Sequence, residues 1–385
     1  MEIKKDYNQL SLLAHKEKRG KWEIASKMPL ETVDDLSIAY TPGVAEPCRA
    51  IAANPELAYE LTMKGNSVAV VSDGTSVLGL GDIGPMAGLP VMEGKAVLYK
   101  KYSGIDGVPI VLASKDVNDI VQAVKMIAPT FGGIHLEDIA APACFEIERR
   151  LTEELDIPVM HDDQHCTAIV VVAGLYNALK VVGKDLSSVR IVVNGAGAAG
   201  IAITGLLIDA GAKSIDLLDS VGIIALGREK MNSEKDRLAK IINPNDKRGT
   251  LAQALAGADV FIGVSRPGLV TRDMVASMNS RAIIFALANP TPEIMPEEAL
   301  AGGAEVIATG RSDYPNQVNN VLVYPGLFRG LLDGRVRRLT SKMKLAAAQA
   351  LADSVKTPKK QCILPSILEE NPAEYIRHAI LQAVV

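Results

Sequence analysis

Residues 189–219 read VRIVVNGAGAAGIAITGLLIDAGAKSIDLLD, and their order of residue types is the clearest structural signal in the chain. The apolar run RIVVN leads into Gly195-Ala196-Gly197-Ala198-Ala199-Gly200, which has GxGxxG spacing and is followed by a segment that suits a helix. A second apolar run ends at Asp219, 19 residues beyond Gly200. Strand, glycine turn, helix, strand and acid in this order are typical of a dinucleotide-binding unit. In such a unit the turn holds a pyrophosphate at the helix N-terminus and the acid binds a ribose hydroxyl.

The same stretch bears on the choice of cofactor. Asp219 favours NAD over NADP, because a carboxylate at this position repels a 2′-phosphate. Arg228 and Lys230 are close enough in the sequence to offset that repulsion, so NAD or NADP is expected, with NAD preferred. The alternative for residues 195–200 is a tight turn that binds no ligand, and the complete pattern around them argues against it.

A second GxGxxG match covers residues 79–84, but its surroundings differ. Pro85, Gly88 and Pro90 follow it, and proline removes a backbone donor and disrupts a helix interior. We therefore expect no helix N-terminus here, and predict a packed or flexible loop that shapes another site.

Short β-rich runs alternate with helical patterns along most of the chain, which predicts a parallel α/β fold in two domains. We expect an α/β catalytic domain over residues 1–163 and a Rossmann-type NAD(P)-binding domain over 164–310. A helical C-terminal segment, 311–385, is expected to pack back onto the catalytic domain. The expected strands are 67–72, 108–113, 133–136, 157–160, 189–193, 214–218, 259–264, 282–286 and 305–308. The expected helices between them are 116–127, 143–155, 200–210, 232–242 and 251–256.

The composition limits the class of protein. The chain has 385 residues, a net charge of −4 and 22% charged residues, as in a globular protein large enough for two domains. No basic run indicates nucleic-acid binding. The longest apolar run, 168–175, is too short to cross a membrane and predicts a buried helix. The charged N-terminus resembles no signal peptide and the four cysteines have no CxxC spacing, so we expect a cytoplasmic protein with free thiols.

Acidic pairs follow two neighbouring expected strands. Glu137-Asp138 comes after one strand and Asp162-Asp163 after the next. Because the carboxyl ends of parallel strands meet at one edge of a sheet, these side chains are expected to converge. Oxygen ligands without cysteine suit Mg²⁺ or Mn²⁺, and a cation would relieve the repulsion among them.

Two other interpretations of these acids stay open. The acids could cap helices, with Asp163 as the N-cap of a helix that starts at Gln164. His161 and His165 could also suggest zinc, but no third ligand of zinc type is evident in the sequence.

Seven sequence blocks identify a family when they are taken together. They occur in this order: Tyr40-TPGVAEPC-48, Gly79-LGDIG-84, Glu93-GKA-96, His135-LEDI-139, His161-DDQH-165, Ala288-NPTP-292 and Gly310-RSDYPNQVNN-320. In this order and spacing, from about Trp22 to Gly330, they resemble the malic enzyme family in its short bacterial form. The resemblance implies oxidation of malate with NAD or NADP and decarboxylation to pyruvate, with a divalent metal.

The resemblance also implies roles for single residues. Lys95 corresponds to the general base of the family and Tyr40 to its general acid. Asp162 corresponds to an acid that supports the base. The implied metal ligands are Glu137, Asp138 and Asp163, and the implied substrate and nicotinamide contacts are Asn289 and Asn320. As a base, Lys95 is expected to have its pKa lowered toward ~7–8.

Two positions depart from the family pattern. Ser76 stands where large eukaryotic members of the family place an arginine that holds a substrate carboxylate. This correspondence implies that Ser76 lines the substrate and that the second carboxylate needs another partner, for which Arg311 and Arg19 are possibilities without positional support. Cys166 stands where the family has glycine in its DDQHGTA block. One hypothesis is that this thiol lies near the metal and makes activity sensitive to oxidation or soft metals.

Two other functions compete with this prediction. A dehydrogenase of related architecture could oxidise a 2-hydroxy diacid without decarboxylation, and a regulatory protein could sense the nicotinamide cofactor without chemistry. The presence of Lys95, Tyr40 and the three acids argues against pure sensing. The family further implies a homodimer.

Overall fold

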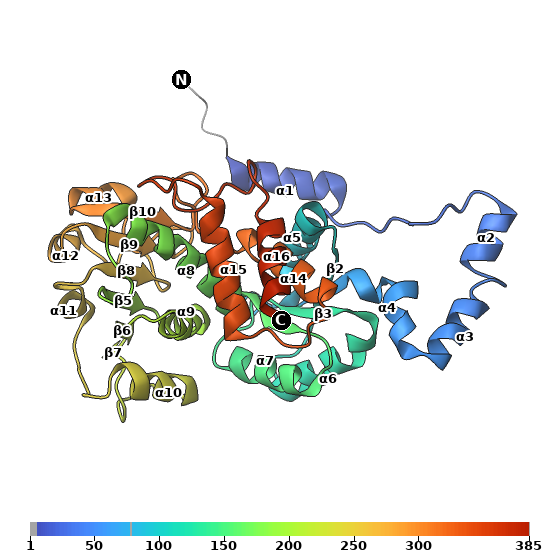
Figure 1. Cartoon of the computed structure of the whole chain (residues 1–385), viewed down its shortest axis with the longest axis horizontal. Helices are drawn as coiled ribbons and strands as arrows, with labels where there is room; N and C mark the ends of the chain where they lie inside the picture. Colours follow the sequence, from blue (N-terminus) through green and yellow to red (C-terminus); the bar gives the residue numbers. More distant parts are fainter. Residues whose placement is uncertain (1–5, 78, 385) are drawn as a thin grey trace, which may run out of the picture.

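The computed structural model describes residues 6–77 and 79–384, which form two sheets surrounded by helices (Figure 1). The sheet of the first half has four parallel strands in the order β2-β1-β3-β4. The sheet of the second half has six strands in the order β10-β9-β8-β5-β6-β7, parallel except for β7. This arrangement confirms the predicted α/β class with a Rossmann-type sheet.

The first sheet consists of β1 (Ser67–Ser72), β2 (Asp106–Val111), β3 (Gly133–Leu136) and β4 (Val159–His161). Alternate side chains of a strand point to opposite faces, and β1 is buried on both. Val68 and Val70 pack in the core that includes Met92 and Tyr99 of α5 (Pro85–Ser103). Ala69 and Val71 pack in the core under α6 (Val117–Ile127) and α7 (Ala143–Glu154).

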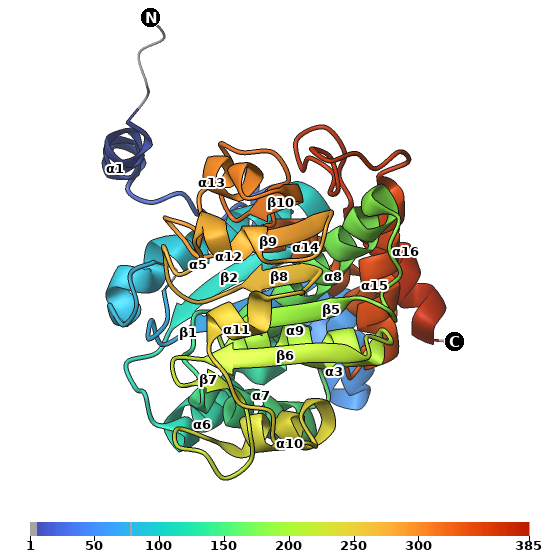
Figure 2. The same ribbon diagram turned by 90° about the vertical axis from the view of Figure 1, so that its left-hand side faces the viewer.

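The second sheet is a Rossmann sheet (Figure 2). One face packs against α8 (Asp162–Val182) and α9 (Ala198–Asp209) through Ile191 and Val193. The other face packs against short helices through Val192, Leu218 and Phe261. The strands are β5 (Arg190–Asn194), β6 (Ser214–Asp219), β7 (Gly222–Ile223), β8 (Val260–Gly263), β9 (Ala282–Ala286) and β10 (Ala304–Thr309). The other helices between the strands of this sheet are α10 (Ser233–Ile242), α11 (Leu251–Leu255), α12 (Arg272–Ala276) and α13 (Pro296–Ala301).

Helix α8 links the two halves. It begins directly after β4 and contains the apolar run 168–175, every residue of which is buried, as predicted. Among the described residues it is the one helix long and apolar enough to cross a membrane, but 72% of its apolar window is buried inside the protein. This burial is typical of the core helix of a globular protein.

The C-terminal segment covers both halves. Helix α14 (Tyr324–Asp333) packs against α5 and α16 (Ala373–Val384), whereas α15 (Ser341–Ser354) packs against α8 and α9. Two glycines allow α14 to pack closely on the first sheet, because a side chain at either position would collide with it. A Cβ on Gly133 would lie 2.8 Å from Phe328, and a Cβ on Gly132 would lie 2.7 Å from Leu332.

Residues 6–54 form a segment that we call the N-terminal arm. Its helices α1 (Tyr7–Lys18), α2 (Val33–Ala39) and α3 (Ala45–Ala53) contain no buried residue, and α2 and α3 project away from the body (Figure 1). Trp22 anchors the arm, because its Nε1 donates to Gly107 O at 2.9 Å. Large apolar side chains lie exposed along it: Tyr7, Leu10, Leu12, Leu13, Ile24, Met28, Leu30, Val33, Leu36, Ile38, Tyr40 and Val44. The arm leads into the body through α4 (Ala58–Leu61) and short 3₁₀ turns.

The predicted strands all form, each within two residues of its expected bounds, and all four cysteines are free. The prediction that no helix follows residues 79–84 is wrong, because α5 begins at Pro85. Proline at the first helical position loses no hydrogen bond, and Pro90 inside the helix is outweighed by the burial of Met92 and Tyr99. The elements β7, α12 and α13 are present in addition to those predicted from the sequence.

Candidate active site

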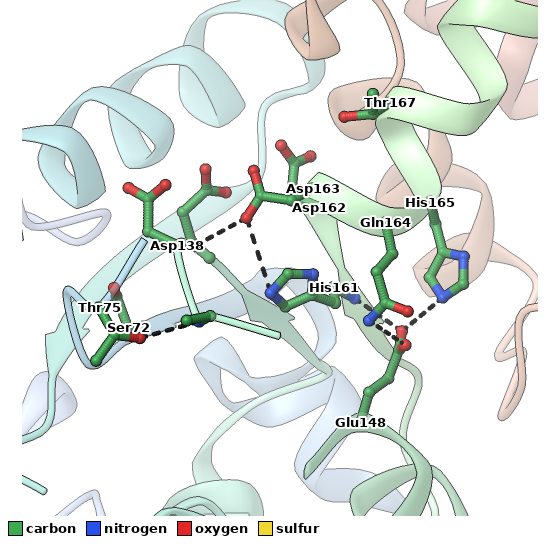
Figure 3. A network of polar contacts seen from close by, with 12 residues as sticks. Ser72, Thr75, Asp138, Glu148, His161, Asp162, Asp163, Gln164, His165 and Thr167 are labelled. Atoms are coloured by element: carbon green, nitrogen blue, oxygen red, sulfur yellow. Dashed lines mark hydrogen bonds and ion pairs between the residues drawn. The ribbon is translucent and has the colours of Figure 1, made fainter. Parts of the chain in front are cut away.

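Four acidic side chains, those of Glu137, Asp138, Asp162 and Asp163, lie at the carboxyl edge of the first sheet, where β3 and β4 end. Figure 3 shows the three aspartates. Carboxylate oxygens of Glu137, Asp138 and Asp163 all lie within 4.8 Å of one another, and we call these three residues the carboxylate cluster. Asp138 has a left-handed φ of 54°, and its backbone N–H donates to Asp163 Oδ2 at 3.1 Å. The predicted convergence of the two acidic pairs is therefore what the structure shows.

The electrostatics of the carboxylate cluster suit a cation. Burial, followed by mutual repulsion, raises the pKa of Asp138 to about 9 and that of Asp163 to about 6. Burial also raises the pKa of Glu137 to about 8, although Lys95 opposes the shift. Asp138 Oδ2 is buried without a hydrogen-bond partner. Three carboxylates, one of which has a buried oxygen without a hydrogen-bond partner, fit the oxygen ligands that Mg²⁺ and Mn²⁺ prefer.

The helix-capping alternative does not describe Asp163. Helix α8 starts at Asp162 with His161 in the N-cap position, so Asp163 lies inside the first turn. His161 and His165, which raised the zinc alternative, belong to no candidate metal group among the described residues. The candidate groups there are the carboxylate cluster and a set of His135, Glu137 and Asp162, and the latter set contacts the ammonium of Lys95.

Lys95 connects the two acidic pairs. Its Nζ lies 2.7 Å from Asp162 Oδ2 and 3.1 Å from Glu137 Oε1, and it sits 4.7 Å from the ring centre of Tyr324. Burial alone would lower the pKa of Lys95, but the Asp162 and Glu137 carboxylates outweigh it and hold that pKa well above its usual range. The expected pKa near 7–8 is therefore wrong for this arrangement, because two carboxylates stabilise the ammonium form.

Asn320 completes this contact. Its Nδ2 donates to Asp162 Oδ2 at 2.7 Å, and its side chain also bonds to the hydroxyl of Thr167 on α8. A residue of the C-terminal segment therefore reaches the edge of the first sheet, 158 positions from Asp162 in the sequence.

A buried network below the carboxylate cluster escaped the sequence analysis. His135 Nε2 lies 2.5 Å from Glu137 Oε2, and its Nδ1 lies 2.7 Å from the hydroxyl of Tyr99. Burial lowers the pKa of His135 to about 4, so the ring is neutral near pH 7. The spacing of Tyr99 four residues after Lys95 places both on one face of α5, but it does not indicate the contact with His135.

The second half carries the predicted dinucleotide turn, residues 195–200. Gly195 has a φ of 121°, and a Cβ there would lie 2.5 Å from Val264 O, while a Cβ on Gly200 would lie 1.8 Å from Gly195 O. Gly197, the N-cap of α9, has open space beside it and no side-chain cap. The N–H groups of Ala198 and Ala199 in the first helical turn are thus free to bind an anion.

Asp219 ends β6 next to this turn, but it is not a free carboxylate. Its Oδ2 accepts from Arg228 at 2.6 Å and from Lys235 at 2.7 Å. These contacts overcome the effect of burial and lower the pKa of Asp219 to about 2. Nε and Nη1 of Arg228 are buried without a partner. Lys235, rather than the expected Lys230, is the second cation.

The remaining predicted residues differ in position. Asn289 follows β9, and a Cβ on Gly79 would lie 3.1 Å from its carbonyl oxygen, so the loop of residues 79–84 packs against the second half. Ser76 is exposed, and its N–H donates to Asp138 O at 2.9 Å.

The structure does not bring Tyr40 to the carboxylate cluster or to Lys95. Tyr40 lies at the end of α2 on the N-terminal arm, with 70% of its surface exposed. Cys166 is fully buried, and burial raises the pKa of its thiol well above the usual range, so it is not a reactive thiolate.

The fold and the site together define a class: an oxidoreductase that binds a nicotinamide dinucleotide on a Rossmann domain, beside a buried cluster of lysine and carboxylates. Two family models narrow the class. "Malic enzyme, N-terminal domain" matches residues 19–152 and "Malic enzyme, NAD binding domain" matches residues 165–379. The chain belongs to the malic enzyme family.

Individual relatives agree with this assignment. The chain is 53% identical to the "Bifunctional malic/malolactic enzyme" of Bacillus subtilis, over 97% of this chain and 92% of that protein. It is 51% identical to the "NADP-dependent malic enzyme" of Halomonas elongata, over 90% and 82%. Among solved structures, the malic enzyme of Pyrococcus horikoshii superposes with a TM-score of 0.94 at 49% identity, covering 98% of this chain and 90% of that one.

Proposed function

We propose that this protein oxidises malate with a nicotinamide cofactor and decarboxylates the product to pyruvate. The observation that carries the proposal is the Lys95 ammonium held between Asp162 and Glu137, at the margin of the carboxylate cluster, in a chain of the malic enzyme family. A proton-transfer group therefore lies next to the group of side chains that best fits a divalent cation.

We assign cation binding and cofactor binding to separate groups of residues. Glu137, Asp138 and Asp163 would hold the cation, and residues 195–200 with Asp219 would hold the cofactor. When bound, the cation polarises the C2 oxygen of malate and the nicotinamide accepts the hydride. Residues 1–163 and the C-terminal segment 311–385 thus form the catalytic unit and residues 164–310 the cofactor unit.

For the oxidation step the Lys95 ammonium first gives up a proton to solvent. The neutral amine then accepts the proton of the substrate C2 hydroxyl, and Asp162 orients Lys95 through the 2.7 Å contact. Asn320 holds Asp162 from the opposite side and, with Asn289 and Ser76, lines the substrate. Tyr40 returns a proton to C3 after CO₂ has left.

For the cofactor, we propose that NAD is preferred and NADP is accepted. Asp219 is the partner expected for a ribose hydroxyl. Arg228 and Lys235 already neutralise it, and the unpaired N–H groups of Arg228 supply donors that a 2′-phosphate would use. The family contains both kinds of enzyme, named NAD-dependent in Geobacillus stearothermophilus and NADP-dependent in Halomonas elongata.

For the assembly, we propose a homodimer in which the N-terminal arm of one copy completes the site of the other. Tyr40 lies on an arm whose large apolar side chains are exposed in the described part of the chain, whereas the side chains of Lys95 and Asp162 are only 14% and 0% exposed. Contact with a second copy would bury the apolar arm and bring in the missing acid. The compartment we propose is the cytoplasm, which fits the four free thiols.

The test of the reaction follows nicotinamide absorbance with purified protein, L-malate, Mn²⁺ and either cofactor, with product identification. Chelator-sensitive reduction with pyruvate and CO₂ supports the proposal. Lactate as product would assign a malolactic reaction, as in the name of the Bacillus relative, and an intact keto acid would assign a dehydrogenase that does not decarboxylate. No reduction with either cofactor by folded, metal-loaded protein would refute it.

The test of the shared site mixes two inactive variants, Tyr40→Phe and Lys95→Met, under conditions that exchange subunits. A dimer with shared sites has one intact site per hybrid, so activity returns to about a quarter of the wild-type value. If Tyr40 acts within its own chain, the mixture stays inactive.

A further inference from the structure

A partly buried carboxylate outside the proposed site contacts the turn that carries the acids of that site. Glu148 lies on α7, its side chain is 13% exposed, and it points at the junction of β4 and α8 (Figure 3). No part of the proposed reaction uses it. Burial is costly for a carboxylate, so its partners indicate what it contributes.

Three donors from one short stretch converge on this side chain. The backbone N–H of His161 donates to Oε1 at 2.8 Å, His165 Nε2 lies 2.8 Å from the same oxygen, and Gln164 Nε2 donates to Oε2 at 3.0 Å. These three residues flank Asp162 and Asp163 on both sides. A single carboxylate therefore fixes the backbone before the two acids and the helical turn after them.

Glu148 supplies a hydrogen-bond acceptor at the start of helix α8, because it accepts the N–H of the N-cap residue His161. His161 occupies the N-cap position but makes no side-chain cap, and both of its ring nitrogens lack hydrogen-bond partners. A buried anion beside a helix N-terminus satisfies free donors and is favoured by the helix dipole. Burial alone would raise the pKa of Glu148, but His165, His161 and Lys344 lower it to about 2, so it stays ionised in any ordinary buffer.

A lysine from the C-terminal segment continues the network. Lys344 Nζ of α15 lies 2.9 Å from His165 Nδ1. An ammonium can only donate, so Nδ1 accepts and Nε2 carries the hydrogen that points at Glu148. The direction of the histidine bond to Glu148 is thus set by α15, which also packs on α8.

We propose that Glu148 is a positioning residue for the metal site, acting through the β4–α8 turn on Asp162 and Asp163. The proposal rests on the metal site proposed above. Asp163 accepts the N–H of Asp138 at 3.1 Å, so a shift of the turn separates Asp163 from the rest of the carboxylate cluster. The same shift moves Asp162 away from Lys95, to which it lies at 2.7 Å.

The test measures Mn²⁺ binding without substrate, by electron paramagnetic resonance of free Mn²⁺, in the full-length protein. Glu148→Gln keeps the shape of the side chain but replaces one acceptor oxygen by a donor that faces Gln164. We expect its Kd for Mn²⁺ to rise about 10- to 100-fold, as for other residues that orient metal ligands. Glu148→Asp should recover part of the loss. The matched control is Glu153→Gln, which changes an exposed acid on the same helix and should leave the Kd unchanged.

Asp163→Asn separates this proposal from the one on which it rests. If wild-type protein binds no Mn²⁺, or Asp163→Asn binds it normally, the metal site itself is refuted. If wild type binds, Asp163→Asn does not, and Glu148→Gln binds within about twofold of wild type, Glu148 has no positioning role. Should Glu148→Gln fail to fold, Lys344→Met tests the same chain of contacts from its other end: a raised Kd supports the proposal, and an unchanged Kd overturns it.

Discussion

The carboxylate cluster and the dinucleotide turn occupy equivalent places, each at the carboxyl end of parallel strands, yet they are built in opposite ways. The cluster consists of buried charged side chains whose pKa values are raised to between about 6 and 9. The turn consists of backbone, in which Gly195 and Gly200 leave no room for a Cβ. The first site therefore resists ionisation until a cation arrives, and the second is a preformed anion-binding turn.

This difference determines which substitutions each site tolerates. A site of backbone donors tolerates changes of charge around it but no added atoms. A site of buried charges tolerates small changes of shape but not the loss of a partner, because the remaining charge is then left unpaired.

The largest effect is expected at Lys95. Replacing it by methionine removes the proposed proton acceptor and leaves Asp162 and Glu137 without their shared cation. We expect kcat to fall by about 10³-fold, the range of general acid–base catalysis, while binding of reduced cofactor, followed by fluorescence, stays unchanged. Lys100→Met, on an exposed position of the same helix, is the control. A fall of less than tenfold would show that Lys95 is not the base.

The next largest effect is expected in the dinucleotide turn. Gly200→Ala adds a Cβ that would lie 1.8 Å from Gly195 O, so the turn must move. We expect the Kd for the cofactor to rise by about 100-fold or more, since a misplaced turn loses several charge-assisted hydrogen bonds. Gly205→Ala, on the same helix with nothing within 4 Å of its Cβ, should bind the cofactor normally. Equal affinities in calorimetric titrations of the two variants would contradict this picture.

The contrast also explains how much the sequence could predict. The turn was predictable because the glycine spacing and the flanking strands and acid lie within one continuous stretch. The convergence of the acidic pairs was predictable because strand ends meet at one edge of a parallel sheet. The hydrogen bond between Lys95 and Asp162 joins residues 67 positions apart, and only the family resemblance brought them together.

Other features had no local signal. The carboxylate of Glu148 and the Tyr99–His135 contact depend on tertiary packing, which neither spacing nor composition encodes. The helix α5 was missed because its prolines were judged without the core that stabilises it. The position of Tyr40 was not predictable either, since the helices of the arm bury no residue from which its place could be inferred.

A smaller effect is expected in the pH dependence of stability. The carboxylate cluster binds protons more tightly in the folded than in the unfolded chain, so without metal the free energy of unfolding falls as pH rises from about 4.5 toward about 9. The slope is at most about 1.4 kcal/mol per pH unit for each such carboxyl. Chelator-treated protein should lose stability between pH 6 and pH 8 in urea titrations, and saturating Mg²⁺ should remove the loss. Asp138→Asn should flatten the dependence; a slope equal to that of wild type would argue against the raised pKa.

The smallest effect is expected in cofactor choice, where a charge beside the dinucleotide turn changes and the turn does not. Arg228→Gln removes the guanidinium whose unpaired N–H groups we assign to the 2′-phosphate, and it partly frees Asp219 for a ribose hydroxyl. We expect kcat/KM with NADP to fall about tenfold, the value of one charge-assisted hydrogen bond, with little change for NAD. Arg237→Gln, which alters an exposed ion pair on α10, should leave the ratio of the two cofactors unchanged. An equal fall with both cofactors would mean that Arg228 supports the fold of the site rather than selecting the phosphate.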